Sequence, residues 1–142
     1  MQPTELHDDK FLQVLWDEHS RIIGIKWKEA TSSMTDDHFK DELALFAAQV
    51  EQKKAPAILV DLCDFRHKMS PSVQEWRVKD ISTRYNEAGV QRFAFLLPAG
   101  SQIPPTMNQG SPGEKFATRA FTDWESAVNW LSAGQVQHSA GD

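Results

Sequence analysis

Asp61, Asp64 and His67 are the side chains of this sequence that could best do chemistry. Two carboxylates and an imidazole can bind a divalent metal ion or transfer a proton. Asp61 ends a continuous apolar run, and binding sites of open α/β sheets form beyond the carboxyl ends of the strands. A small metal-assisted enzyme that uses these three residues is therefore one hypothesis for the function.

A structural interpretation of the same three residues is favoured. Asp61 then braces the loop after its strand, Asp64 makes an Asx-turn, and His67 is exposed. Residues spaced by three within a loop have no fixed geometry, and short motifs of this kind often match by chance. We therefore predict no metal, no cofactor, no catalytic residue and no enzymatic activity.

Cys63, which lies between the two aspartates, is the single cysteine of the chain. A reactive thiol needs a lowered pKa, whereas neighbouring carboxylates raise it, so a buried structural cysteine is expected. One cysteine cannot form an internal disulfide bond, and this composition fits a reducing cytoplasm. We expect a cytoplasmic protein.

Composition and motifs exclude several other classes. The net charge is −5 and no basic stripe is interleaved with aromatic residues, so nucleic acid is not an expected partner. The chain lacks the glycine-rich phosphate loops and the G-x-S-x-G nucleophile elbow. No run of about 18 apolar residues occurs, so no membrane span is predicted.

Hydrophobic periodicity predicts which elements position these residues. Two alternating segments separated by a short polar link indicate an antiparallel hairpin, and later apolar runs alternate with amphipathic segments. The order is β-β-α-β-α-β-loop-β-α, an α/β fold with a mixed, mostly parallel five-stranded sheet and helices packed on it. The predicted strands cover residues 11–17, 22–27, 57–62, 92–97 and 116–121, and the helices cover residues 33–54, 70–89 and 122–131.

One domain over residues 11–131 is expected. Residues 1–10 are polar and are predicted to be a flexible N-terminus, and residues 132–142 are small and polar and are predicted to be a disordered tail. Residues 98–115 are rich in glycine and proline. A loop of that length is predicted to be mobile or functional.

Trp76 lies about 160° around its predicted helix from the apolar stripe. Its indole either packs back on Phe65 or Met69, which is slightly favoured, or serves a protein contact, for which tryptophan is a preferred residue. Exposed indoles at Trp76 and at Trp16 and Trp27 of the hairpin would predict association. We expect a homodimer whose interface includes Trp76 or the hairpin edge.

Four segments resemble the SpoIIAA-like family of the STAS superfamily, a group of small bacterial domains. They are Ile58-Leu59-Val60-Asp61-Leu62 followed by Asp64-Phe65, Gln74-Glu75-Trp76 early in the next helix, Arg92-Phe93-Ala94-Phe95-Leu96, and Phe121-Thr122-Asp123-Trp124-Glu125-Ser126-Ala127-Val128-Asn129-Trp130-Leu131. With the order of elements, the similarity covers roughly residues 11–131.

The resemblance implies a regulatory or ligand-binding module, not an enzyme, that acts through a protein partner or a small amphiphilic ligand. In antagonists of anti-sigma factors from this superfamily, a partner kinase phosphorylates a serine where the helix after the central strand begins. Ser70 and Ser72 lie nearest to that place, although the Asp-x-Ser-Gly arrangement of those antagonists does not follow Asp61. Relatives viewed as binders of lipid-like molecules make a lipophile carrier a further expectation.

Overall fold

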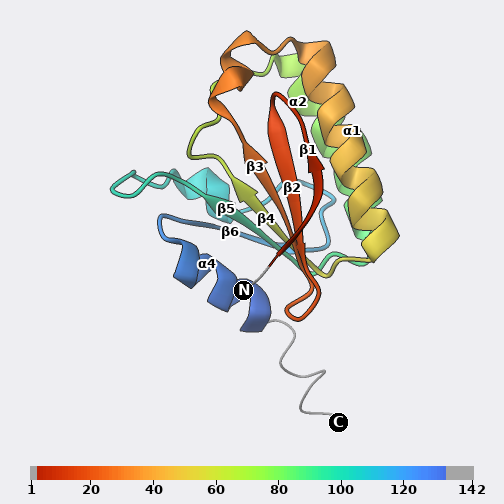
Figure 1. Ribbon diagram of the computed structural model, residues 1–142, viewed down its shortest axis with the longest axis vertical. Coiled ribbons are helices and arrows are strands. Elements are labelled where there is room, and N and C mark those ends of the chain that lie inside the picture. Colours follow the sequence, from red (N-terminus) through yellow and green to blue (C-terminus); the bar gives the residue numbers. More distant parts are fainter. Residues whose placement is uncertain (1–2, 134–142) are drawn as a thin grey trace.

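Six strands form one mixed sheet in which each strand lies beside its neighbour in sequence (Figure 1). The computed structural model describes residues 3–133. The strands are Thr4–Asp8 (β1), Leu12–Asp17 (β2), Ile22–Trp27 (β3), Ala57–Asp61 (β4), Arg92–Leu96 (β5) and Ala117–Phe121 (β6). β1, β2 and β3 are antiparallel, whereas β3 to β6 are parallel. The α/β class and the N-terminal hairpin followed by parallel strands are thereby confirmed.

The helices begin where capping residues satisfy the first backbone amides. Helix α1 covers Asp36–Lys53, and Thr35 and His38 form a capping box at its start. Ser70 caps α2 (Pro71–Trp76), which continues through a π-helical turn, η2 (Arg77–Ile81), into α3 (Ser82–Ala88). The remaining elements are α4 (Trp124–Ala133) and two 3-10 turns, Glu29–Ser33 (η1) and Pro105–Asn108 (η3).

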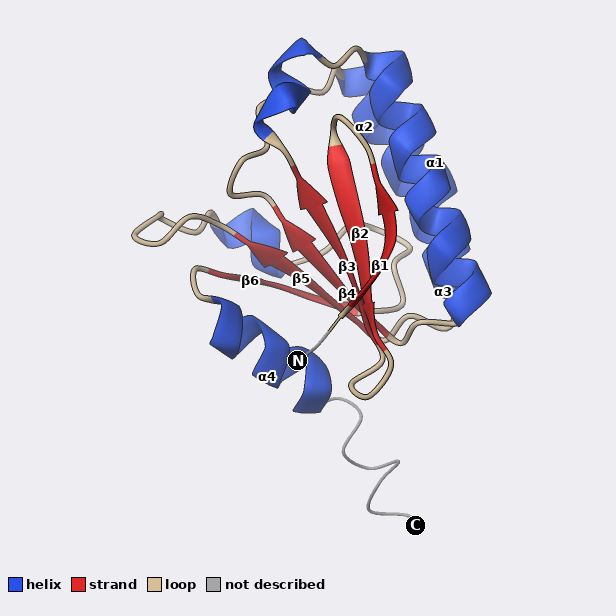
Figure 2. Cartoon of the chain, viewed as in Figure 1, coloured by secondary structure: helices blue, strands red, loops and turns tan. Residues whose placement is uncertain are grey.

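The helices cover the two faces of the sheet unequally (Figure 2). Right-handed crossovers between successive parallel strands bring α1 and the α2–α3 segment to the same face. There they enclose the larger core, in which Phe46 and Tyr85 meet Ile58 and Phe93 of the sheet. Helix α4 covers the other face over a smaller core that includes Leu131.

Strand β1 corrects the prediction that residues 1–10 are a flexible N-terminus. Its residues pair with β2, which raises the strand count from five to six. Backbone pairing explains the difference, because a polar strand at a sheet edge needs no apolar pattern to form its hydrogen bonds. The predicted tail lies mostly outside the described residues, although Ser132 and Ala133 belong to α4.

The tryptophans of the hairpin are not exposed, contrary to expectation. Trp16 and Trp27 are only 3% and 2% exposed, because the alternation of β2 and β3 points them into the larger core under α1. Trp124, at the start of α4, is 44% exposed. The hairpin indoles therefore offer no surface for a dimer.

Candidate ligand pocket

The third crossover of the parallel sheet contains no α-helix. Between β5 and β6 the chain forms an irregular segment whose one regular piece is the short turn η3. Several hydrogen bonds anchor this segment. Asn108 accepts one from the amide of Ala120 at 2.8 Å, Glu114 accepts one from the hydroxyl of Ser82, and the carbonyl of Gly113 accepts one from Asn86 at 2.8 Å. The space that a third helix would fill is therefore left partly open.

A pocket of about 400 Å³ occupies this space, between the sheet, the α2–α3 segment and the 98–115 loop. Its floor alternates along the strands, with Ile25, Val60 and Phe95 in register on three neighbouring strands. Phe93 and Phe116 stack at 5.7 Å between ring centroids, and Tyr85 meets Phe93 at 6.0 Å. The wall is thus mostly aromatic and aliphatic, as in pockets for small organic ligands.

The other end of the pocket is aromatic too. Trp27 stacks on Phe39 at 5.5 Å and meets the edge of Phe65 at 5.2 Å. All three rings line the pocket. Large flat side chains at both ends favour a ligand with a flat or extended apolar body.

Polar side chains also line this pocket, among them Glu114, Arg77 and Thr118, and the last two form no strong hydrogen bond or ion pair within the described chain. Arg77 donates a hydrogen bond to Gln74 at 3.3 Å and, among the described residues, forms no ion pair. Oγ1 of Thr118 is buried and has no hydrogen-bond partner within the described chain. A buried hydroxyl without a partner is costly, and a ligand acceptor would remove that cost.

Arg77 is the first residue of the π-helical turn η2. One extra residue in a helical turn changes which side chains face inward, and such turns are frequent at functional sites. Here both Arg77 and Ile81, the first and last residues of η2, line the pocket. The turn therefore brings a guanidinium group to a wall whose other polar side chains include Gln74, Glu114 and Thr118.

Asp61, Asp64 and His67 are not assembled into a metal site. Asp61 pairs in register with Lys26 and Leu96, on the face that α4 covers, and its Oδ1 accepts a hydrogen bond from the amide of Cys63 at 2.9 Å. This hydrogen bond is consistent with the bracing role predicted for Asp61. Within residues 3–133, the one group of three possible ligands lies elsewhere and includes none of these residues. Among the same described residues, Asp64 does not form the Asx-turn that was expected of it.

His67 lies on the opposite side and is not exposed, contrary to prediction. Its side chain is 9% exposed and stacks on Phe39 at 5.6 Å, while Nε2 lies 2.9 Å from Oδ1 of Asp36. A hydrogen bond from Ser70, together with His67, lowers the pKa of Asp36. This contact joins the start of α1 to the loop before α2.

Cys63 behaves as expected for a structural cysteine. The pKa of its thiol is raised to about 11 by burial, by the hydrogen bond with Asp61 and by the charges of Asp61 and Asp64. The thiol is half-buried against the smaller core. A thiolate at neutral pH is therefore disfavoured.

Ser70 and Ser72 lie together at the start of α2, with their hydroxyl oxygens 3.2 Å apart. Ser70 acts as the N-cap and accepts a hydrogen bond from the amide of Val73 at 3.4 Å. Trp76, further along this helix, is half-buried and packs against the larger core, with Nζ of Lys40 5.5 Å from its ring centroid. The packing interpretation of Trp76 is favoured by this burial.

Sequence reasoning missed the polar residues of the pocket. Thr118 and Arg77 belong to no motif, and only the long loop before β6 indicated that this region is special.

Comparisons of the chain with family models, curated proteins and solved structures gave no match. In the described part of the chain, no helix combines the length and the apolar character needed to cross a membrane.

Proposed function

We propose that this chain is a non-enzymatic binding module of the SpoIIAA-like kind, whose pocket takes a small amphiphile with an apolar body and one anionic group. The carrying observation is an apolar pocket of about 400 Å³ with an arginine in its wall that forms no ion pair with the described residues. This volume lies within the ~300–1,000 Å³ typical of ligand pockets.

The pocket limits the size of the ligand. If each non-hydrogen atom takes about the volume of a water molecule, ~30 Å³, the pocket holds roughly a dozen such atoms. At about 0.5 kcal/mol per atom, within the range known for small ligands, the binding free energy is about −6 kcal/mol. That value corresponds to a Kd of tens of micromolar.

The two polar groups without a strong partner among the described residues, Arg77 and Thr118, then each have a role. The guanidinium of Arg77 forms charge-assisted hydrogen bonds with a carboxylate or a similar anion. Thr118 donates its buried hydroxyl to an acceptor further along the ligand. The apolar rings exclude water, which strengthens both interactions.

The test compares ligands that differ only in their head group. Decanoate and 4-phenylbutyrate, each with its methyl ester and its amine analogue, are titrated into the protein and followed by calorimetry. Denaturing mass spectrometry of freshly purified protein detects a carried molecule. We expect the carboxylates to bind more tightly than the amines. Absence of both binding and a co-purified molecule would contradict the proposal.

Two variants assign the binding to this pocket. Arg77→Met removes the charge but keeps the length, so the affinity for the carboxylates should fall at least tenfold, since a charged hydrogen bond contributes about 1.5–3 kcal/mol. Binding of the methyl esters should not change. Arg119→Met, in an exposed position on β6, is the matched control. Equal losses in both variants would refute the role of Arg77.

A further inference from the structure

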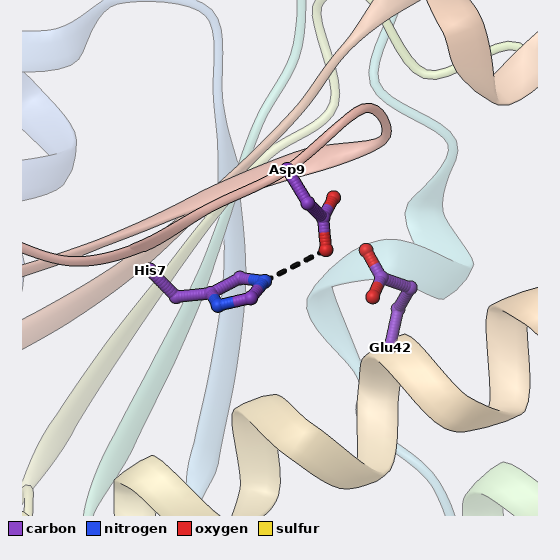
Figure 3. Close-up of side chains that lie close together, drawn as sticks. All are labelled: His7, Asp9 and Glu42. Carbon is purple, nitrogen blue, oxygen red and sulfur yellow. Dashed lines mark hydrogen bonds and ion pairs between the residues drawn. The ribbon is translucent and has the colours of Figure 1, made fainter.

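His7, Asp9 and Glu42 bring an imidazole and two carboxylates together away from the pocket (Figure 3). One ligand atom from each residue lies within 4.8 Å of the other two, and all three residues are half-buried. Nε2 of His7 is 2.7 Å from Oδ2 of Asp9. The group joins the edge strand β1, the β1–β2 turn and helix α1.

Local structure explains how these side chains meet. The register of β1 shifts between Glu5 and His7, so His7 is paired with Val14, whose side chain lies in the core under α1. Such a bulge re-aims a side chain to the other face of a strand. Without the extra residue, the face toward α1 would receive a different side chain.

Two backbone amides fix the orientation of the Asp9 carboxylate. Its Oδ1 accepts hydrogen bonds from the amides of Phe11 at 2.8 Å and Leu12 at 3.1 Å, which leaves Oδ2 directed toward His7. Lys28 also donates a hydrogen bond to the backbone carbonyl of Asp9 at 2.7 Å. Outer contacts of this kind orient the ligands of metal sites.

One carboxylate oxygen of Glu42 lacks a hydrogen-bond partner within the described residues. With both carboxylates ionised, Oε2 of Glu42 is buried and has no hydrogen-bond partner among the described residues, and its neighbour Asp9 is a second anion. Burial and the Asp9 carboxyl raise the pKa of Glu42 to about 7. Burial also acts to raise the pKa of Asp9, but hydrogen bonds with His7, Glu42 and two backbone amides outweigh it and hold that pKa at about 2. The two carboxyl groups therefore need a cation between them, either a proton or a metal ion.

We propose that His7, Asp9 and Glu42 bind a divalent transition-metal ion, with zinc as the best match, and that the ion fastens the edge strand β1 to helix α1. This site is independent of the pocket and of the function proposed for it. A mixed set of one imidazole and two carboxylates suits zinc, whereas magnesium and calcium prefer oxygen ligands alone. Ligand atoms around tetrahedral zinc lie about 3.3 Å apart, so small side-chain rotations complete the site.

The test uses the full-length chain after treatment with a chelator. Zinc is titrated calorimetrically at pH 7.5, magnesium serves as the comparison ion, and thermal melts follow the stability. We expect one zinc ion per chain and a zinc-dependent rise in Tm, because an ion that binds the native state stabilises it. Zinc should bind more weakly at pH 6, since it must displace the shared proton.

Conservative variants locate the ion. His7→Gln and Glu42→Gln should each lower zinc affinity at least tenfold, and Glu42→Gln should keep the fold because its amide can donate to Asp9. His19→Gln and Glu87→Gln change exposed residues distant in sequence and serve as matched controls. Cobalt(II) substitution adds a visible spectrum that His7→Gln should alter.

The zinc titrations and thermal melts of these variants either support or overturn the proposed site. Loss of zinc binding in the two site variants but not in the controls supports the site. Unchanged affinity in His7→Gln and Glu42→Gln, or no zinc-dependent change in Tm, overturns it and leaves a proton shared between Asp9 and Glu42.

Discussion

Glu42→Gln should make the metal-free protein more stable at alkaline pH. Glu42 faces Asp9 and His7 across the β1–β2 turn and lies beside Asp41 on its own helix. Burial and the Asp9 carboxyl raise the pKa of Glu42 to about 7, from an ordinary value of 4.5. The unfolded chain therefore releases this proton at a lower pH than the native protein does.

The sign follows from that difference. The favourable contribution of protonated Glu42 is fully present below pH 4.5 and is lost as the pH rises through about 7. Asp9 acts in the opposite direction, because its pKa is lowered in the native protein. The stability that ionised Asp9 adds is fully present above its ordinary pKa of 3.8, so it does not change between pH 5 and pH 8. The free energy of unfolding should therefore fall between about pH 5 and pH 8 because of Glu42.

The magnitude is reduced by solvent. The full shift corresponds to about 3 kcal/mol, and because Glu42 is only partly buried we discount it to about 1–2 kcal/mol. Glutamine carries no charge and can donate to Asp9, so the variant should gain this amount at pH 8 and almost nothing at pH 5. Such a gain raises Tm by several degrees in a chain of this size.

Urea denaturation of both proteins at pH 5 and pH 8, with a chelator present, measures the effect. Glu87→Gln, an exposed glutamate on α3, is the control for loss of one negative charge. Parallel pH dependence in the wild type and Glu42→Gln would refute the raised pKa of Glu42.

Three further predictions concern other parts of the molecule. Asp61→Ala should lower the free energy of unfolding by about 1 kcal/mol in urea melts, because the amide of Cys63 loses its acceptor, and Asp64→Ala should have a smaller effect. Equal effects would contradict the bracing role of Asp61. Thr118→Val should raise the free energy of unfolding by about 1 kcal/mol and weaken ligand binding, because it removes a buried hydroxyl without a partner; a destabilised variant would show that the hydroxyl is satisfied. Homodimerisation through Trp76 stays a prediction: sedimentation should detect a dimer that Trp76→Ala shifts toward monomer with an unchanged far-UV CD spectrum, and a monomer at high concentration would exclude it.

Local patterning determined most of the fold. The alternation of Leu12, Val14 and Trp16 was enough to place β2, and it also correctly put these residues on one face. The continuous apolar run that Asp61 ends corresponds to β4, and the helix predicted from residue 70 begins at α2 with Ser70 as its N-cap. These signals are legible because side-chain periodicity and capping depend on neighbours in sequence.

Strand β1 could not be predicted in this way. Its residues are exposed or half-buried and all except Leu6 are polar, so no apolar periodicity distinguishes them from a free terminus. Pairing with β2 alone defines the strand, and a bulge within it decides that His7 faces α1. Backbone pairing between segments leaves little trace in the side chains of an edge strand.

The sites were decided by tertiary structure for the same reason. Asp61 and His67 are close in sequence, yet Asp61 points to the face that α4 covers, whereas the loop after β4 carries His67 to the start of α1 on the other face. Glu42 is far from Asp9 in sequence, yet α1 lies over the hairpin and brings the two carboxyls together. Spacing along the chain predicts which elements form, but which side chains share a site depends on how those elements pack.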